Sequence, residues 1–216
     1  MVAKPPKPKA APARERERYH HGELRRGLID AALELIGSGG PEAFTLREAA
    51  RRLGVNHRAA YRHFADKETL LAAVAEQGFW ALLGAAREAV GALPEATPEA
   101  RLLAIGRAYV RFCAMNPAHF RVMFGARLNE GGRFPALEVP IAEAFEVLQR
   151  EVASGVEAGA LAAGTGPRMA ALSLWSAMHG LATLIVTRRI AVRKERLAST
   201  VDTLLGPTVR GLVAKR

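Results

Sequence analysis

Apolar residues recur every three or four positions along most of the chain, which is the spacing of amphipathic helices. The first such segment covers residues 22–40 and ends in Ser-Gly-Gly-Pro, a typical helix stop. A second helix of about two turns is predicted after Thr45, because Thr45 and Glu48 match the capping-box pattern. The apolar face of this helix would consist of Leu46, Ala49, Ala50 and Leu53.

Two further helices are predicted directly after this one. Gly54 ends the second helix, and Asn56 can cap a short third helix over residues 57–64. Asp66 can cap a long fourth helix that runs to about Val90. Two short helices joined by a tight glycine turn, between two longer helices, are typical of a helix-turn-helix DNA reader.

From residue 99 onward the pattern stays helical and shows no strand-like alternation. Pro207 either kinks the last helix or ends it near Leu205. The apolar stretch of residues 172–187 is shorter than the roughly 20 residues that span a bilayer, so we interpret it as a buried helix. The expected helices, separated by breaks that contain Gly or Pro, cover residues 99–115, 118–124, 136–158, 167–188 and 193–213.

Basic residues gather at the two ends of the chain. The sequence has 31 Lys and Arg against 21 Asp and Glu, a formal net charge of +10. Residues 1–67 carry 14 basic and 8 acidic side chains, residues 68–187 carry 9 and 11, and residues 188–216 carry 8 and 2. This excess favours a polyanionic partner, either nucleic acid or an anionic membrane. The basic residues 188–196 equally fit the solvated end of a helix.

Residues 1–18 are predicted to be a disordered basic arm. They contain four prolines and six basic side chains but almost no large apolar residue, so they bury too little surface to offset the entropy of ordering. Such an arm either contacts the backbone or minor groove of DNA or remains a solvated tail.

The stretch FTLREAARRLGVNHRAAYRHFADKETLL closely resembles the amino-terminal domain of TetR-type transcriptional regulators. This resemblance implies an all-helical protein with an amino-terminal three-helix helix-turn-helix domain over residues 19–66. A larger helical ligand-binding and dimerisation domain would follow over residues 67–216. The residues that carry the resemblance are Thr45, Ala50, Gly54, Val55, Tyr61, His63, Phe64, Lys67, Glu68 and Leu70. Among these we expect a core role for Ala50, Gly54, Val55 and Phe64.

The resemblance also implies which side chains contact double-stranded DNA. Phosphate contacts, which give affinity without sequence choice, fall on Thr45, Tyr61, His63 and Lys67. Asn56, His57 and Arg58 are candidates for base edges, since Arg can bridge guanine and Asn can bridge adenine. Arg47 can reach either target, and Arg62 completes the expected DNA-binding set.

The third helix departs from the family pattern. Many members have Gly-Thr where this chain has Arg58-Ala59, so the operator of a relative cannot be carried over. Ala59 can still contact a thymine methyl group. We interpret Arg51 and Arg52, on the second helix, as a solvated face rather than as base readers.

The segments NPAHFRVMFG and LWSAMHGLATL resemble a carboxy-terminal effector domain of TetR-type regulators, marked here by Trp175, His179 and Gly180. This implies a homodimer formed by residues 167–213, in which Gly180 permits close helix approach, and a palindromic operator. It also implies a small apolar ligand that releases a repressor from DNA. At helical spacing, aromatic and methionine residues more often belong to a plain hydrophobic core than to a pocket. The candidate ligand-binding residues are Phe112, Met115, Phe120, Met123, Phe124, Trp175, Met178 and His179, with Phe79 and Trp80 nearby.

Three other classes of function are weighed against this reading. An enzyme would need Cys113 with His119 or His179, but no phosphate-binding loop, metal-ligand spacing or other cofactor motif is present, so we expect neither metal nor cofactor. A non-specific architectural DNA binder held by the basic ends is the main alternative. A membrane-surface module fits less well, and we expect no membrane partner. The lone cysteine and the lack of a secretory leader predict a cytoplasmic protein.

Overall fold

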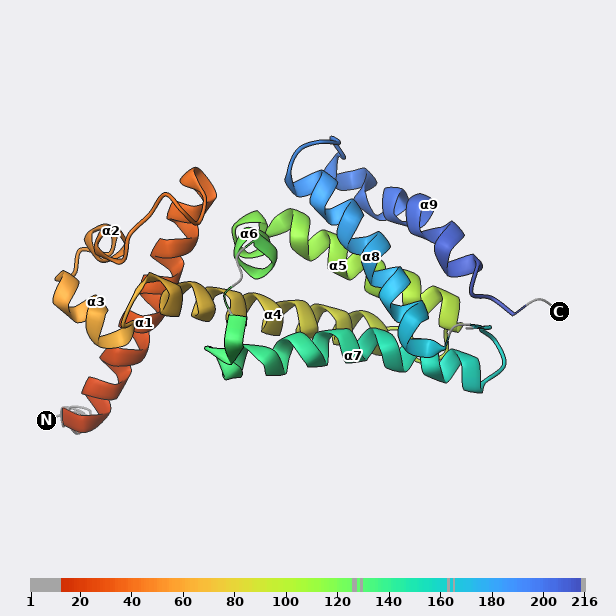
Figure 1. Ribbon diagram of the computed structural model, residues 1–216, viewed down its shortest axis with the longest axis horizontal. Coiled ribbons are helices and arrows are strands. Elements are labelled where there is room, and N and C mark those ends of the chain that lie inside the picture. Colours follow the sequence, from red (N-terminus) through yellow and green to blue (C-terminus); the bar gives the residue numbers. More distant parts are fainter. Residues whose placement is uncertain (1–12, 126–127, 129, 163, 165, 215–216) are drawn as a thin grey trace, which may run out of the picture. The chain divides into compact units, whose positions relative to one another are not determined.

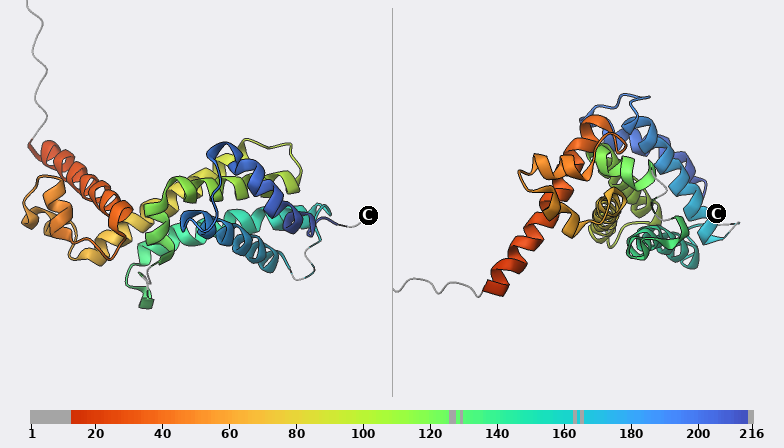
Figure 2. Two further views of the ribbon diagram at one scale, coloured as in Figure 1. Left: turned by 90° about the horizontal axis from the view of Figure 1, so that it is seen from above. Right: turned by 60° about the vertical axis from the view of Figure 1, so that its left-hand side comes forward.

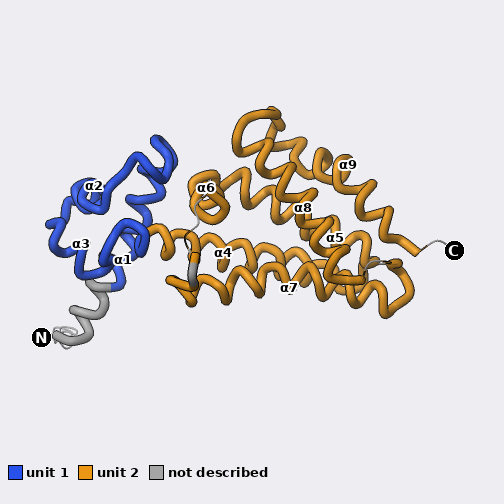
Figure 3. Tube along the Cα trace, viewed as in Figure 1, with its two compact units in different colours: residues 1–70 blue, residues 71–216 orange. Residues whose placement is uncertain are grey.

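The computed structural model of the chain is built from helices and describes residues 13–125, 128, 130–162, 164 and 166–214 (Figure 1). Within these residues the only strand-like pairing is an isolated antiparallel bridge between Leu161 and Val213. The predicted all-helical fold is therefore confirmed. The chain divides into two compact units, residues 1–70 and 71–216, a few residues beyond the expected boundary at residue 66 (Figure 3).

The first unit contains three helices and the start of a fourth. They are α1 (Ala13–Gly39), α2 (Leu46–Arg52), α3 (His57–His63) and the first turn of α4 (Lys67–Gly91). α1 contacts both α2 and α3, and these two short helices contact each other. The arrangement is the one predicted for a helix-turn-helix domain.

α1 begins earlier than expected. Residues 13–18, which we predicted to belong to the disordered arm, form its first turns. Alanine, arginine and glutamate are strong helix formers, and the last proline before this run is Pro12, so no residue between 13 and 18 interrupts the helix. The rest of the predicted arm, residues 1–12, lies outside the described residues.

Apolar residues of α1 and the two short helices form the core of the first unit. Ala50 and Phe64 are buried, as predicted from the resemblance. Burying one large apolar side chain stabilises a fold by about 1.5–3 kcal/mol, so this small core depends on its few large members. The members with no exposed surface, or with at most 2% of it, are Leu28, Ala32, Ile36, Phe44, Leu46, Ala49, Ala50, Ala60, Phe64 and Leu70.

Three residues that we expected to face the interior of this unit lie nearer the surface. Gly54 is exposed and Val55 is half-buried, while Leu53, predicted on the apolar face of α2, is 37% exposed. All three belong to the turn between α2 and α3. Gly54 adopts a φ of +74°, a conformation that costs other residues energy, so its role is to permit the turn rather than to pack.

The second unit contains most of α4, five further α-helices and two short 3-10 helices. α5 contacts each of the other four α-helices that follow it, so it occupies the centre of this group (Figure 1 and Figure 2). The bounds agree with the predicted ranges to within a few residues, except that the last helix begins later. These elements are α5 (Pro98–Met115), α6 (Pro117–Gly125), η1 (Glu130–Gly132), α7 (Pro135–Glu157), α8 (Pro167–Val186), η2 (Lys194–Arg196) and α9 (Leu197–Arg210).

α9 continues through Pro207 instead of ending near Leu205. The carbonyl oxygen of Pro207 accepts a hydrogen bond from the backbone N–H of Gly211 at 3.0 Å. Just beyond α9, the N–H of Ala162 donates to the carbonyl of Leu212 at 2.6 Å, and the N–H of Ala214 donates to the carbonyl of Ala160 at 3.1 Å. The end of the described chain is therefore paired with the connection between α7 and α8.

Two helices, α4 and α8, are long and apolar enough to cross a membrane by length and composition alone. Within the protein, 61% of the apolar window of α4 is buried but only 33% of that of α8. We predicted a buried helix here, yet Met169, Leu172 and Leu184 of α8 are 50%, 38% and 44% exposed. One face of α8 thus packs inside the unit while another presents apolar side chains to the outside.

Candidate functional site

α2 begins at a side-chain cap. The Oγ1 of Thr45 accepts a hydrogen bond from the backbone N–H of Glu48 at 3.2 Å, which confirms the cap predicted from the sequence. A cap of this kind is worth about 1 kcal/mol. It fixes the first turn of α2, in which the side chain of Arg47 is exposed.

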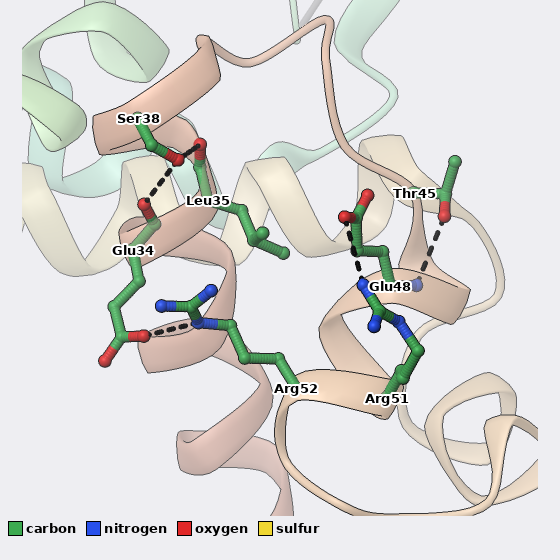
Figure 4. Close-up of polar contacts among 7 residues, drawn as sticks. All are labelled: Glu34, Leu35, Ser38, Thr45, Glu48, Arg51 and Arg52. Carbon is green, nitrogen blue, oxygen red and sulfur yellow. Dashed lines mark hydrogen bonds and ion pairs between the residues drawn. The ribbon is translucent and has the colours of Figure 1, made fainter.

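The arginines at the end of α2 are exposed and paired with carboxylates (Figure 4). Arg51 lies 3.5 Å from Glu48 in the same helix. The Nε of Arg52 donates to the carboxylate of Glu34 at 2.6 Å, which links α2 to α1. Exposed pairs of this kind contribute at most about 1 kcal/mol, and both arginines fit the expected solvated face.

Asn56 caps α3. Its Oδ1 accepts a hydrogen bond from the backbone N–H of Arg58 at 2.9 Å. We predicted both this cap and a contact between Asn56 and a base edge. The capping bond uses the amide oxygen that a bidentate contact with adenine would also use. Asn56 therefore has to share this oxygen between capping α3 and contacting a base.

The outer face of α3 carries four of the ten candidate DNA-binding residues. His57, Arg58, Tyr61 and Arg62 are exposed, and Tyr61 is 44% exposed despite its ring. Residues four apart lie on the same side of a helix, so these four form two adjacent pairs opposite the buried Ala60. Ala59 and His63 are half-buried at the margin of this face.

Lys67, at the start of α4, is held by two contacts. Its Nζ donates to the backbone carbonyl of Glu42 at 3.0 Å and lies 5.0 Å from the centre of the Phe44 ring. An ammonium group has three N–H donors, so this bond leaves others for an anion. The side chain is thus positioned before any phosphate arrives, which lowers the entropy cost of a contact.

In the second unit, four of the eight predicted ligand-binding residues lie in one cluster of rings. The ring of His179 lies 4.7 Å from that of Phe124, 5.4 Å from that of Phe120 and 6.0 Å from that of Trp175, measured between centroids. Phe79 of α4 joins the cluster through Phe124, at 5.5 Å.

The cluster contains a chain of polar groups that the sequence did not reveal. The indole N–H of Trp175 donates to the hydroxyl of Tyr109 at 3.3 Å, and this hydroxyl lies 2.9 Å from the Nδ1 of His179. Indole is only a donor, so the tyrosine oxygen accepts from Trp175, while the direction of its bond with Nδ1 follows the tautomer of the imidazole. Burial lowers the pKa of His179 and raises the pKa of Tyr109, which keeps both groups neutral at pH 7.

Tyr109 and Phe145 are members of this site that sequence reasoning missed. Phe145 lies 6.0 Å from Trp175, again between ring centres. Tyr109 did carry a signal, because it falls on the buried stripe of α5 and a buried tyrosine hydroxyl needs a hydrogen-bond partner.

The other four predicted ligand-binding residues have different surroundings. Met115 is 51% exposed, and Phe112 contacts the ring of His119 at 6.4 Å. Met123 and Met178 are buried against glycines, Gly78 and Gly106, whose missing side chains leave room for the sulfur atoms. For these four residues, the helical spacing in the sequence indicated a shared helix face but not a shared site.

Cys113 has the properties of a core residue. It has no exposed surface, and burial raises the pKa of its thiol to about 12. A nucleophilic cysteine needs the opposite shift, toward the thiolate. Among the described residues, no group of three or more His, Cys, Asp or Glu side chains is arranged to hold a metal ion.

Two family models match the chain. Residues 28–74 match the model described as bacterial regulatory proteins of the tetR family. Residues 102–206 match the model described as the Tetracyclin repressor-like C-terminal domain. The chain is also 42% identical over 89 residues to the HTH-type transcriptional regulator BetI of Rhizobium meliloti, a match that covers 40% of this chain and only 42% of that regulator.

Solved structures are similar over most of the chain. A Rhodococcus sp. RHA1 protein of unknown function has a TM-score of 0.76 and 31% identity, and the match covers 90% of this chain and 97% of that one. The transcriptional regulator FadR of Bacillus subtilis, solved in complex with stearoyl-CoA, has a TM-score of 0.70 and 18% identity over 87% of this chain and 98% of its own. The second likeness concerns the fold alone.

The cap of α3 predicts how Asn56 variants behave. Asn56→Ala should lower the free energy of unfolding by about 1 kcal/mol, because the Arg58 N–H loses its acceptor. Asn56→Ser, which keeps a capping oxygen, should retain most of that stability in urea denaturation. A serine variant as unstable as the alanine variant would contradict the capping role.

The raised pKa of Cys113 predicts slow thiol chemistry in the native protein. At pH 8 a thiol with a pKa of about 12 is ionised in only about one molecule in ten thousand. Native Cys113 should therefore react with a maleimide at least roughly a hundredfold more slowly than in the unfolded chain, and faster as pH rises. Labelling time courses with and without urea measure the ratio, and equal rates would show that the thiol is accessible.

Proposed function

Because the chain belongs to the TetR family of bacterial transcriptional regulators, we propose that it is a repressor that binds a palindromic operator as a homodimer and is released by a small apolar ligand. The observation that supports DNA binding is the exposed face of α3. Both α3 and its neighbour α2 are short helices that begin at a side-chain cap. A helix in this setting enters the major groove with its first residues on base edges.

We assign two kinds of DNA contact to this surface. Arg58 and His57, at the start of α3, read base edges, with Asn56 restricted by its capping bond. Thr45, Tyr61, His63 and Lys67 bind phosphates, and Lys67 is supported by its fixed position over Phe44. Arg47, Ala59 and Arg62 lie beside these residues and complete the set.

The dimer is proposed to form through α8 and α9. Met169, Leu172 and Leu184 of α8 and Leu204 of α9 are all exposed by 38% or more in the single chain. Covering such side chains with a second copy would remove apolar surface from water. A two-fold dimer also explains why one short reading helix per chain suffices, since two half-sites about 34–36 Å apart double the contacts.

The ligand is proposed to bind among the rings around His179. The cluster supplies an apolar surrounding with one short chain of polar groups, from Trp175 through Tyr109 to His179, which suits an apolar molecule that carries a single polar end. α4 carries both Phe79 of the cluster and Lys67 of the reader, so a ligand that moves Phe79 acts on the helix that holds Lys67. A coupling of about 1–3 kcal/mol between the two sites is typical of such regulators.

Selection of binding sites from a random duplex pool tests the reader. We expect a palindromic consensus from the wild type, and Arg58→Ala should relax one symmetric pair of positions at a cost of roughly 1–3 kcal/mol. Arg51→Ala is the matched control, because it also removes one exposed cation, from α2. Equal, salt-sensitive binding of all duplexes would instead support the alternative, a non-specific architectural DNA binder.

Tryptophan fluorescence tests the ligand site. The chain has two tryptophans, so Trp80→Phe leaves Trp175 as the only indole and Trp175→Phe leaves Trp80. With stearoyl-CoA as the probe, we expect emission to change in Trp80→Phe and not in Trp175→Phe, together with release of operator DNA. A change in emission seen only in Trp175→Phe, in which Trp80 is the remaining indole, would place the acyl chain outside the rings around His179.

A further inference from the structure

The connection between α8 and α9 is the most basic surface segment of the second unit. Residues 188–196 contain five cations and one acidic residue, Glu195. All five cations are exposed. The proposed reader and ligand site make no use of these cations, which are Arg188, Arg189, Arg193, Lys194 and Arg196.

Carboxylates balance many other arginines of this unit. Arg87 pairs with Glu143 at 2.6 Å, and Arg107 pairs with Asp202 at 2.5 Å. By contrast, in the part of the chain that the structure describes, none of the five cations of the connection lies within ion-pair distance of a carboxylate. The charge of this segment is therefore available to an outside partner.

Arg188 occupies a backbone position that favours glycine. Its φ is +58°, the only positive value for a residue other than glycine in the described chain. The N–H of Arg188 donates to Ile185 and that of Arg189 donates to Leu184, at 3.0 and 2.8 Å, which is the hydrogen-bond pattern of a helix stop that usually has glycine at this point. Arginine here costs conformational energy, so its presence points to a use for the side chain.

The place of the connection in the second unit means that a dimer would contain two such basic segments. α9 lies along α5 in the opposite direction, since Arg107 pairs with Asp202 and Gly106 lies against Leu205. The connection therefore lies beside the end of α5 at which α6 begins (Figure 1). Since α8 and α9 are the helices assigned to the dimer, each dimer would carry two such basic segments, with ten cations between them.

The chemistry of the segment fits the backbone of DNA better than insertion into a lipid surface. Insertion into a membrane interface uses exposed large apolar or aromatic side chains. Within residues 188–196 the only large apolar residues, Ile190 and Val192, are half-buried. We propose that residues 188–196 form a second contact with duplex DNA, independent of base sequence and separate from the helix-turn-helix; the choice of DNA as partner rests on the proposed function.

The test compares the salt dependence of binding to a duplex of scrambled sequence. The variants are Arg188→Gly and the triple change Arg193→Ala, Lys194→Ala and Arg196→Ala. Arg150→Ala, which removes one exposed cation of α7, controls for the loss of a single charge. Affinity is measured by fluorescence anisotropy between roughly 50 and 200 mM salt, where each lost phosphate contact reduces the logarithmic slope by about 0.9. Thermal melting checks that each variant is folded.

We expect both connection variants to bind the scrambled duplex several-fold more weakly and with a shallower slope, while Arg150→Ala matches the wild type. Arg188→Gly should melt no lower than the wild type, because glycine suits the backbone at this position. Unchanged slopes in both connection variants would overturn the proposal even where operator selection succeeds. A loss of binding confined to vesicles of phosphatidylcholine and phosphatidylserine would overturn it in favour of a lipid partner.

Failure of the proposed function would give a different result from failure of this second contact. It would appear as a wild-type protein that selects no operator, whereas this proposal concerns only how the scrambled duplex is bound. Tyr61→Phe and Lys67→Ala change the reader and leave the connection intact, so they should weaken operator binding without removing the effect of Arg188→Gly on the scrambled duplex.

Discussion

The seven-residue helices α2 and α3 are too short to persist alone, because isolated helices of fewer than about 12–15 residues are marginal in water. They exist because capping oxygens from Thr45 and Asn56 satisfy their first turns and because Ala49, Ala60 and Phe64 are buried against the rest of the unit. All of this stabilisation comes from the inner side and the ends. The side chains on the outer side of α3 are therefore not needed to stabilise the helix, and they can be suited to a binding partner.

This division explains which features of the first unit could be predicted from the sequence. Thr45, Asn56 and Asp66 act on backbone groups two or three residues away, so a local pattern was enough to find them. The expectation that Gly54 belongs to the core was wrong, because this residue is exposed. Its backbone conformation, not its burial, explains the residue, and a glycine in a sequence pattern does not distinguish the two roles.

The second unit was harder to predict, because its site depends on contacts between residues distant in the sequence. Helix positions and the ring-bearing residues could be read from spacing, but Tyr109 and His179 are 70 positions apart, and no local pattern joins them. The same limit applies to Met115, which shares the apolar character of its neighbours yet lies on the exposed side of α5. Periodicity identifies a face of a helix; it does not identify what that face meets.

The backbone pairing of residues 160–162 with residues 212–214 has a consequence for how the protein opens. It joins the two ends of the segment that contains α8 and α9, so this segment is closed at its base by hydrogen bonds. Neither helix can leave α5 by fraying from the chain end while that closure holds. Local unfolding of this region should be a single cooperative event, and the two helices should behave as one unit of stability.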